Sequence, residues 1–252
     1  MTRIPHDSST QHPIRLPLFG MPWKLLVGLL AVAAVMVLVD EPLSTVLRAV
    51  TVPGDVDQEL RFFQQFGQMG SILLMTVLVW CLEPPAIRRT LLDFGLAVAI
   101  TSILALVIKM LTGRVRPAFG SPNEFLGPWW IQENLAVTWS QGGSMPSSHV
   151  AAGAVMSTWL WIVFPKIRWV GVVLLMLVGV ARVRFGSHWP SDVPLGAMLG
   201  IVIAWLCINR LLGTRLLDLI WRTFVDRKAS PAWPDVAAAI QEQQRSHHSP
   251  PE

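Results

Sequence analysis

Two short polar stretches next to apolar runs hold the residues that could carry out chemistry. The first is SMPSSHVAAG at residues 144–153, where Ser147, Ser148 and His149 directly precede an apolar run. A serine before such a run suits a helix N-cap, and the free amides of the first turn then favour an anion. The stretch therefore predicts an anion-binding helix start, with an ordinary helix start as the alternative.

The second stretch is ARVRFGSHWPSDVPLG at residues 181–196, which contains Arg182, His188 and Asp192. A carboxylate at Asp192, near a predicted helix start, could accept a hydrogen bond from the His188 ring, fix its tautomer and leave the other ring nitrogen free to attack. The alternative is a histidine that is simply satisfied at an interface. His149 and His188 are the only histidines outside the terminal tails, which weakens that alternative.

Basic residues lie close to both stretches. Lys109 and Arg116 belong to the segment KMLTGRVRP at residues 109–117, where Gly113 can terminate a helix. Each cation alone could be a snorkelling side chain at a membrane interface. Together with Arg182, they supply the several donors that the equatorial oxygens of a phosphoryl group need during transfer. One histidine could then be the nucleophile while the other protonates the leaving oxygen.

We expect no metal and no cofactor. No cluster of aspartate, glutamate and histidine suited to Mg²⁺ or Zn²⁺ is visible in these loops. The lysine and the arginines would therefore take the role that a metal has elsewhere.

The elements that must position these residues are apolar. The chain has 252 residues, of which 52% are hydrophobic and 14% charged, against roughly 25% charged in soluble domains. Each apolar run is shorter than the roughly 20 residues of a full crossing, so each helix must extend into its flanks. We expect an all-α, polytopic membrane protein with six transmembrane helices. The six runs are Leu25 to Val39, Met69 to Leu82, Phe94 to Ile108, Val150 to Phe164, Trp169 to Ala181 and Val193 to Ile208.

The domain organisation follows from the ends of the chain. Residues 1–20 are predicted to be a disordered cytoplasmic tail, residues 21–225 a six-helix membrane domain, and residues 226–252 a mobile cytoplasmic tail with no more than a short turn from Val236 to Ile240. On the sixth run, Gly196 and Gly200 predict close helix packing within the monomer, with dimerisation as the weaker alternative.

The distribution of basic residues predicts the orientation. With a cytoplasmic N-terminus, 13 of the 20 lysines and arginines fall on the cytoplasmic side and seven outside. Chemistry would dictate the positions of Lys109, Arg116 and Arg182, which leaves a bias of 13 to 4. Under the positive-inside rule both ends are cytoplasmic, and the site opens to the periplasm or exterior of a bacterial inner membrane.

The spacing of the site residues resembles a known signature. Lys109 with six residues before Arg116-Pro117, then Pro146-Ser147-Ser148-His149, then Arg182 with five residues before His188 and three more before Asp192, is similar to the three-part motif of the type-2 phosphatidic acid phosphatase and vanadium haloperoxidase superfamily. The six apolar runs resemble its membrane-bound lipid phosphatase branch. The match covers the third to the sixth run.

The resemblance implies a role for each matching residue. His188 attacks phosphorus and forms a phosphohistidine, Asp192 orients it, and His149 protonates the leaving alkoxide. The chain departs from the family where Ser148 replaces a glycine and Ala181 a serine. The phosphate is held by Lys109, Arg116, Ser147, Ser148 through its amide, and Arg182.

These observations favour a metal-independent phosphatase for a lipid mono- or diphosphate, within a membrane phosphatase domain over residues 21–225. A lipid phosphotransferase with the same intermediate is the alternative. An anion channel or transporter is disfavoured because the charges gather at the span ends. The expected partners are a membrane lipid phosphate and the bilayer, with no nucleic acid and no evident protein partner. Phosphatidic acid, phosphatidylglycerol phosphate, a polyprenyl diphosphate and a glycolipid phosphate would all present the same group.

Overall fold

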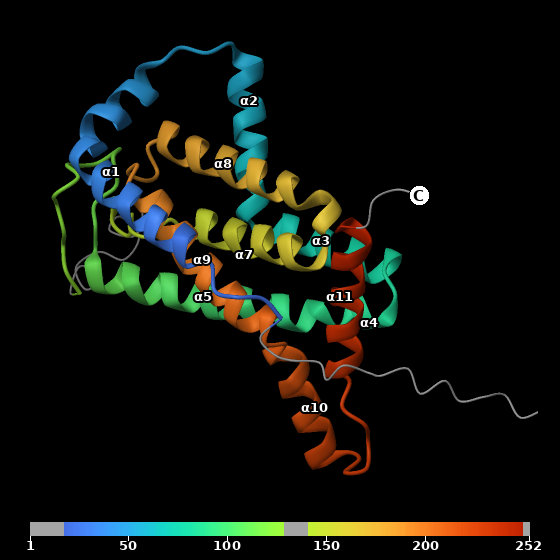
Figure 1. Ribbon diagram of the computed structural model, residues 1–252. Helices are drawn as coiled ribbons and strands as arrows, with labels where there is room; N and C mark the ends of the chain where they lie inside the picture. Colours follow the sequence, from blue (N-terminus) through green and yellow to red (C-terminus); the bar gives the residue numbers. More distant parts are fainter. Residues whose placement is uncertain (1–17, 129–140, 249–252) are drawn as a thin grey trace, which may run out of the picture.

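The computed structural model describes residues 18–128 and 141–248. In this part of the chain the regular elements are helices, and the sole β-type contact is an isolated bridge between Arg114 and Phe125 (Figure 1). The expected all-α fold is confirmed. In chain order the elements are α1 (Trp23–Ala49), α2 (Gly54–Phe63), the 3-10 helix η1 (Gln64–Gly67), α3 (Met69–Leu82), α4 (Pro85–Arg88), α5 (Thr90–Thr112), α7 (Ser148–Val163), the 3-10 helix η2 (Pro165–Ile167), α8 (Arg168–Arg184), α9 (Asp192–Asn209), α10 (Leu212–Phe224) and α11 (Trp233–His248).

Each of the six apolar runs forms the body of one helix, but fewer helices are long enough to cross a bilayer. Among the described residues, three have the length and hydropathy of a span: α1, the stretch Pro85–Thr112, and α9. The pair α2 and α3, bent by 65°, is a fourth candidate. By length and composition the described residues thus support three spans or up to four, and the expected six are not confirmed. The physical reason is length, because α7 has only 16 residues and α8 only 17, whereas a crossing takes about 20.

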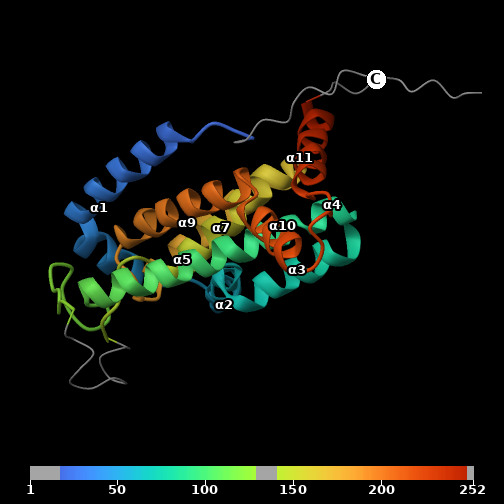
Figure 2. The same cartoon turned by 90° about the horizontal axis from the view of Figure 1, so that it is seen from below.

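The short helix α7 lies at the centre of the molecule. It contacts α5, α8 and α9, and Figure 2 shows α1 on the outer side of α9, with α7 and α5 on the opposite side. Trp159 of α7 is fully buried and stacks on Phe94 of α5, with ring centroids 4.7 Å apart. Its indole nitrogen donates to the Thr90 hydroxyl at 3.2 Å. These contacts fix the position of α7 along α5.

Helix α9 approaches the backbone of α7 very closely. A Cβ atom on Gly196 would lie 2.6 Å from the Ser147 carbonyl oxygen, and one on Gly200 would lie 2.2 Å from the carbonyl oxygen of Ala151. Only glycine allows this approach. The expected close packing within the monomer is therefore confirmed.

The C-terminal segment contains more structure than the short turn expected from Val236 to Ile240. Residues Trp233–His248 form α11, and Val236, Ala237 and Ile240 on it are fully buried. The apolar stripe is short, yet it suffices because α4 and α7 supply the surface against which it packs. The boundaries expected for the two tails and the membrane domain remain predictions.

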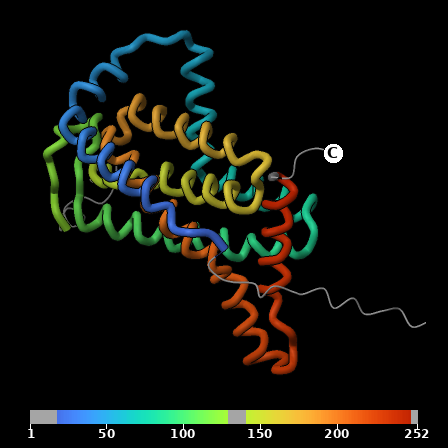
Figure 3. The backbone as a smooth tube through the Cα atoms, in the orientation of Figure 1, coloured from blue at the N-terminus to red at the C-terminus, as the bar shows by residue number. Residues whose placement is uncertain are grey.

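Four chain segments meet at one end of the bundle. The C-terminal end of α5, the N-terminal end of α7, the C-terminal end of α8 and the N-terminal end of α9 gather there, as the tube in Figure 3 shows. Backbone hydrogen bonds connect them: Ser144 donates to Arg114 at 2.9 Å, and Ser147 donates to Asp192 at 3.2 Å. All three motif stretches are thereby brought to one place.

Candidate active site

A cavity of about 300 Å³ opens at this end of the bundle. Six of the eight predicted site residues line it, and the remaining two, Ser147 and Asp192, lie buried next to them. Ser102 and Leu106 of α5, together with Gly142 and Gly143, complete the lining. The six are Lys109, Arg116, Ser148, His149, Arg182 and His188.

The three cations of the cavity are held by neutral acceptors. Lys109 Nζ donates to the Gly143 carbonyl, and Arg116 Nε donates to the carbonyl of Gly142 at 3.2 Å. Burial lowers the pKa of the Arg116 guanidinium below its ordinary value. Arg182 Nη1 donates to the side chain of Gln64 at 3.1 Å, while its Nε is buried and has no hydrogen-bond partner among the described residues.

No salt bridge within the described residues involves any of these three cations. Three other arginines do form salt bridges, each with an aspartate: Arg61, Arg114 and Arg184. The arrangement is therefore suited to an anion with several oxygens, such as a phosphate group.

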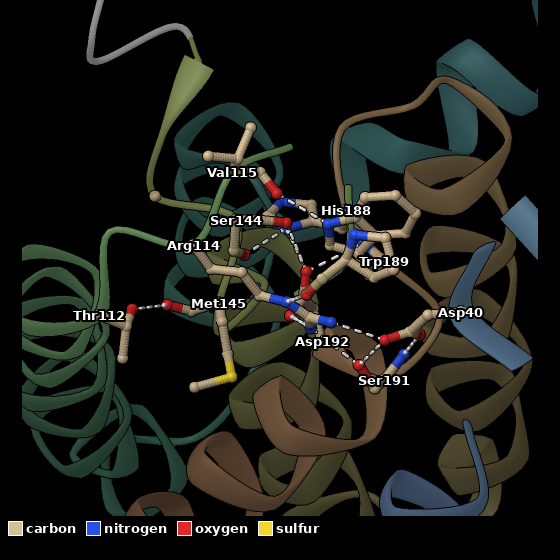
Figure 4. A network of polar contacts seen from close by, with 12 residues as sticks. Asp40, Thr112, Arg114, Val115, Ser144, Met145, His188, Trp189, Ser191 and Asp192 are labelled. Carbon is tan, nitrogen blue, oxygen red and sulfur yellow. Dashed lines mark hydrogen bonds and ion pairs between the residues drawn. The ribbon is translucent and has the colours of Figure 1, made fainter. Parts of the chain in front are cut away.

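His188 is held differently from the sequence-based expectation. Its Nδ1 lies 2.6 Å from the Ser144 carbonyl oxygen, whereas the Asp192 carboxylate is 3.9 Å away, beyond hydrogen-bond distance (Figure 4). The Asp192 Oδ2 instead accepts from the Ser144 hydroxyl and from the Trp189 backbone at 2.9 Å. Because a carbonyl can only accept, it places the ring proton on Nδ1 and leaves Nε2 as the nitrogen available to the cavity.

His188 is also kept neutral. Burial is the main reason that the pKa of its imidazole is lowered to about 3, with smaller contributions from the nearby cations Lys109 and Arg182 that Asp192 opposes. A neutral imidazole with a free Nε2 lone pair can act as a nucleophile at ordinary pH.

His149 contacts a residue that sequence reasoning missed. Its Nε2 lies 2.9 Å from the amide nitrogen of Gln68. The preceding 3-10 helix touches the start of α7, since a Cβ atom on Gly67 would lie 2.0 Å from the His149 carbonyl oxygen. Gln64 from the same segment binds Arg182. The signal in the sequence was a pair of glutamines four residues apart just before an apolar run.

Ser147 occupies the predicted N-cap position of α7 without acting as a side-chain cap. Its backbone is extended, with φ of −70° and ψ of 110°, and its hydroxyl makes no capping hydrogen bond. That hydroxyl is buried and has no partner in the described structure. The Ser147 hydroxyl is therefore an unused hydrogen-bond donor next to the residues that line the cavity.

Sequence reasoning also missed the role of Arg114. It lies behind His188, bonded to Asp40 and Asp192, each at 2.6 Å. In the part of the chain that the structure describes, no group of three or more histidine, cysteine, aspartate or glutamate side chains is placed to hold a metal ion.

Three similar proteins have related sequences over part of the chain. An undecaprenyl-diphosphatase from Sulfolobus acidocaldarius is 30% identical over 116 residues, which is 44% of this chain and 54% of the relative. The undecaprenyl-diphosphatase BcrC of Bacillus subtilis is 26% identical over 171 residues, covering 68% of this chain and 79% of the relative. The bacitracin transport permease protein BcrC of Bacillus licheniformis is 25% identical over 143 residues, covering 57% and 66%. The chain thus spans about half the length of the archaeal relative.

Two solved structures share the fold. One is LpxE of Aquifex aeolicus, with a TM-score of 0.55 and 19% identity over 68% of this chain and 95% of that one. The other is a transmembrane PAP2-type phosphatidylglycerolphosphate phosphatase of Bacillus subtilis, with a TM-score of 0.51 and 22% identity over 74% and 93%. The PAP2 superfamily model matches residues 90–214, which include every motif residue that lines the cavity. Residues 90–214 of the chain therefore form a PAP2 superfamily domain.

Proposed function

We propose that this protein is a metal-independent phosphatase that hydrolyses a lipid mono- or diphosphate through a phosphohistidine at the outer face of the membrane. The observation that carries the proposal is the cavity in which two histidines face three cations that form no salt bridge with any described carboxylate. The phosphatase activities named for relatives and structural neighbours support the same assignment.

The residues support a two-step reaction. In the first step, the Nε2 lone pair of His188 attacks phosphorus, the bond from phosphorus to the leaving oxygen breaks, and His149 donates a proton to that oxygen. In the second step, water attacks phosphorus and gives a proton to His149, and the P–N bond breaks to release phosphate. Lys109, Arg116 and Arg182 stabilise the equatorial oxygens in both transition states.

The size of the cavity constrains the substrate. A volume of about 300 Å³ is at the small end for ligand pockets, so it suits a phosphate or diphosphate headgroup whose hydrocarbon chain stays in the bilayer. Two of the three similar proteins are named undecaprenyl-diphosphatases. A polyprenyl diphosphate is therefore the first substrate to test.

The decisive experiment measures phosphate release by purified protein in detergent. The panel holds a polyprenyl diphosphate, phosphatidic acid, phosphatidylglycerol phosphate and a glycolipid phosphate, each with excess EDTA. We expect release from at least one lipid, and none from the His188→Ala variant. Absence of release from all four, or activity that disappears with EDTA and returns with Mg²⁺, would refute the proposal. Phosphate that appears on a second lipid instead of in water would identify a phosphotransferase.

The proposal includes six spans and an outward-facing site, supported by the bias of 13 to 4 basic residues. Ser121, in the loop after α5, and Ser230, between α10 and α11, are both exposed. Cysteine at each position, in a background without Cys81 and Cys207, can be probed on intact cells with a membrane-impermeant thiol reagent. We expect position 121 to be labelled and position 230 protected. The reverse pattern would overturn the orientation.

A further inference from the structure

A buried charge network lies behind His188 and consists of residues that do not line the cavity. Arg114 connects two aspartates: its Nη1 lies 2.6 Å from Asp192 Oδ1, and its Nη2 lies 2.6 Å from Asp40 Oδ2 (Figure 4). The side chain of Arg114 is 4% exposed and both carboxylates are 0% exposed. Arg114 does not line the cavity, so it is not one of the phosphate-binding cations.

Asp40 comes from α1, outside the region matched by the superfamily model. It accepts hydrogen bonds from the Ser191 backbone nitrogen at 2.8 Å and from the Ser191 hydroxyl at 2.7 Å. The Ser191 hydroxyl in turn accepts from Arg114 at 2.8 Å. Because Ser191 directly precedes Asp192 at the start of α9, Asp40 and Arg114 together hold the segment on which Asp192 stands.

The charges of this network do not cancel. One guanidinium faces two carboxylates, which leaves a net charge of −1. If Asp40 were neutral, Arg114 would compensate Asp192 and the network next to His188 would have no net charge. A buried ion pair contributes little net stability, because desolvation offsets the attraction. A second buried carboxylate is therefore poorly explained by stability alone.

The reaction supplies a reason for the excess negative charge. When His188 Nε2 bonds to phosphorus while Nδ1 keeps its proton, the ring becomes cationic. Asp192 lies 3.9 Å from that Nδ1, so a net anionic network stabilises the cation that forms. The Ser144 carbonyl holds the proton in place but carries no charge.

We propose that Asp40 and Arg114 are positioning residues for the nucleophile: they hold Asp192 beside His188 and keep the network anionic, so that the phosphohistidine is stabilised as it forms. This inference rests on the proposed function. The inference adds Asp40 of α1 to the residues that support the site.

The test compares Asp40→Asn with a matched control. Asp93 is also fully buried and accepts three hydrogen bonds, from Gly213 and Thr214, but it belongs to the junction of α5 and α10 and does not line the cavity. We expect Asp40→Asn to lower kcat by about ten- to hundredfold, as losses of orienting residues around a site do, with KM nearly unchanged. Asp40→Glu should restore part of kcat, and Asp93→Asn should leave it unchanged while lowering the melting temperature.

A second readout does not depend on lipid hydrolysis. Inorganic phosphate binds through the cations, whereas inorganic vanadate can also bond to the nucleophile in five-coordinate geometry. Both can be titrated by the shift in melting temperature. We expect Asp40→Asn to weaken vanadate binding by about tenfold and to leave phosphate binding unchanged. A wild-type protein that binds vanadate more tightly than phosphate but hydrolyses no lipid would refute the proposed function while still testing the network.

The network proposal has its own refutations. An Asp40→Asn variant with wild-type kcat and a wild-type preference for vanadate over phosphate would overturn it. Equal weakening of both anions would also overturn it, because that pattern indicates general damage to the cavity. If Asp40→Asn does not fold, Ser191→Ala replaces it, since this change removes the hydroxyl bridge between Asp40 and Arg114 without altering charge. The expectation is the same selective loss of vanadate affinity, and its absence counts against the proposal.

Discussion

Replacing Asp192 by asparagine tests whether charge or a hydrogen bond makes His188 a nucleophile. The ring proton is held by the Ser144 carbonyl at 2.6 Å, while the Asp192 carboxylate stands 3.9 Å from the same nitrogen. Asparagine keeps the shape of the side chain and removes its charge. The tautomer should therefore survive, and the stabilisation of the cationic phosphohistidine should be lost.

The magnitude follows from the distance. A unit charge 3.9 Å from Nδ1 stabilises a new positive charge by about 4 kcal/mol at an effective dielectric constant of about 20. Since each 1.36 kcal/mol is about tenfold in rate, kcat should fall by roughly a thousandfold. Loss of the correct tautomer would cost more, about ten thousandfold in the serine protease triad.

The assay is single-turnover phosphate release, with the phosphoenzyme trapped by an alkaline denaturing quench, because the P–N bond of a phosphohistidine hydrolyses in acid. Asp192→Asn should lower the rate of phosphoenzyme formation and leave phosphate affinity unchanged, and the Asp93→Asn control should behave as wild type. A fall of less than tenfold would refute the electrostatic role of Asp192. A fall far beyond ten thousandfold would show that the carboxylate, not the Ser144 carbonyl, orients the ring.

Three other predictions concern the nucleophile, the acid and the packing of α9. Because the pKa of His188 is lowered from 6.5 to about 3, the unfolded chain binds more protons between these values, so stability should decline as pH falls through this window. His188→Asn should make the melting temperature fall less steeply with decreasing pH. Parallel curves of melting temperature against pH for the variant and the wild type would contradict a neutral, buried His188. Gln68→Ala removes a hydrogen bond to His149 worth about 1 kcal/mol. It should slow the hydrolysis of an alkyl phosphate about fivefold and that of an aryl phosphate less, because an aryl leaving group needs less help from the acid. Equal slowing of both substrates would contradict a link between Gln68 and the acid His149. Gly200→Ala puts a methyl group 2.2 Å from the Ala151 carbonyl oxygen, so unfolding should become easier by about 1–3 kcal/mol, and an unchanged melting temperature would contradict the close packing.

The sequence was informative wherever a local pattern carries the structure. The apolar runs predicted the helices because a buried or lipid-facing helix must be apolar over its length. Gly113 ends α5 in the left-handed conformation, as expected, with φ of 57°. The spacing of the motif residues also predicted that Lys109, His149 and Arg182 act at one site, and all three line the same cavity.

The sequence was uninformative where the partner lies far along the chain. Asp40 is separated from Arg114 by 74 residues and from Ser191 by 151, and no local pattern pairs such residues. The interval of four between His188 and Asp192 pointed to a hydrogen bond. However, α9 begins only at Asp192, so His188 lies outside the helix and the carboxylate turns back to Trp189 and Ser144.

The contacts of η1 and α1 with the site have a consequence for protein engineering. Gln64, Gln68 and Asp40 reach Arg182, His149 and the start of α9 from outside residues 90–214. A chimaera that keeps residues 90–214 but takes its first helices from another family member would exchange these three partners together. Compatibility between donors should therefore depend on the polar side chains that the leading helices present. Matching their hydrophobic length alone would not be enough.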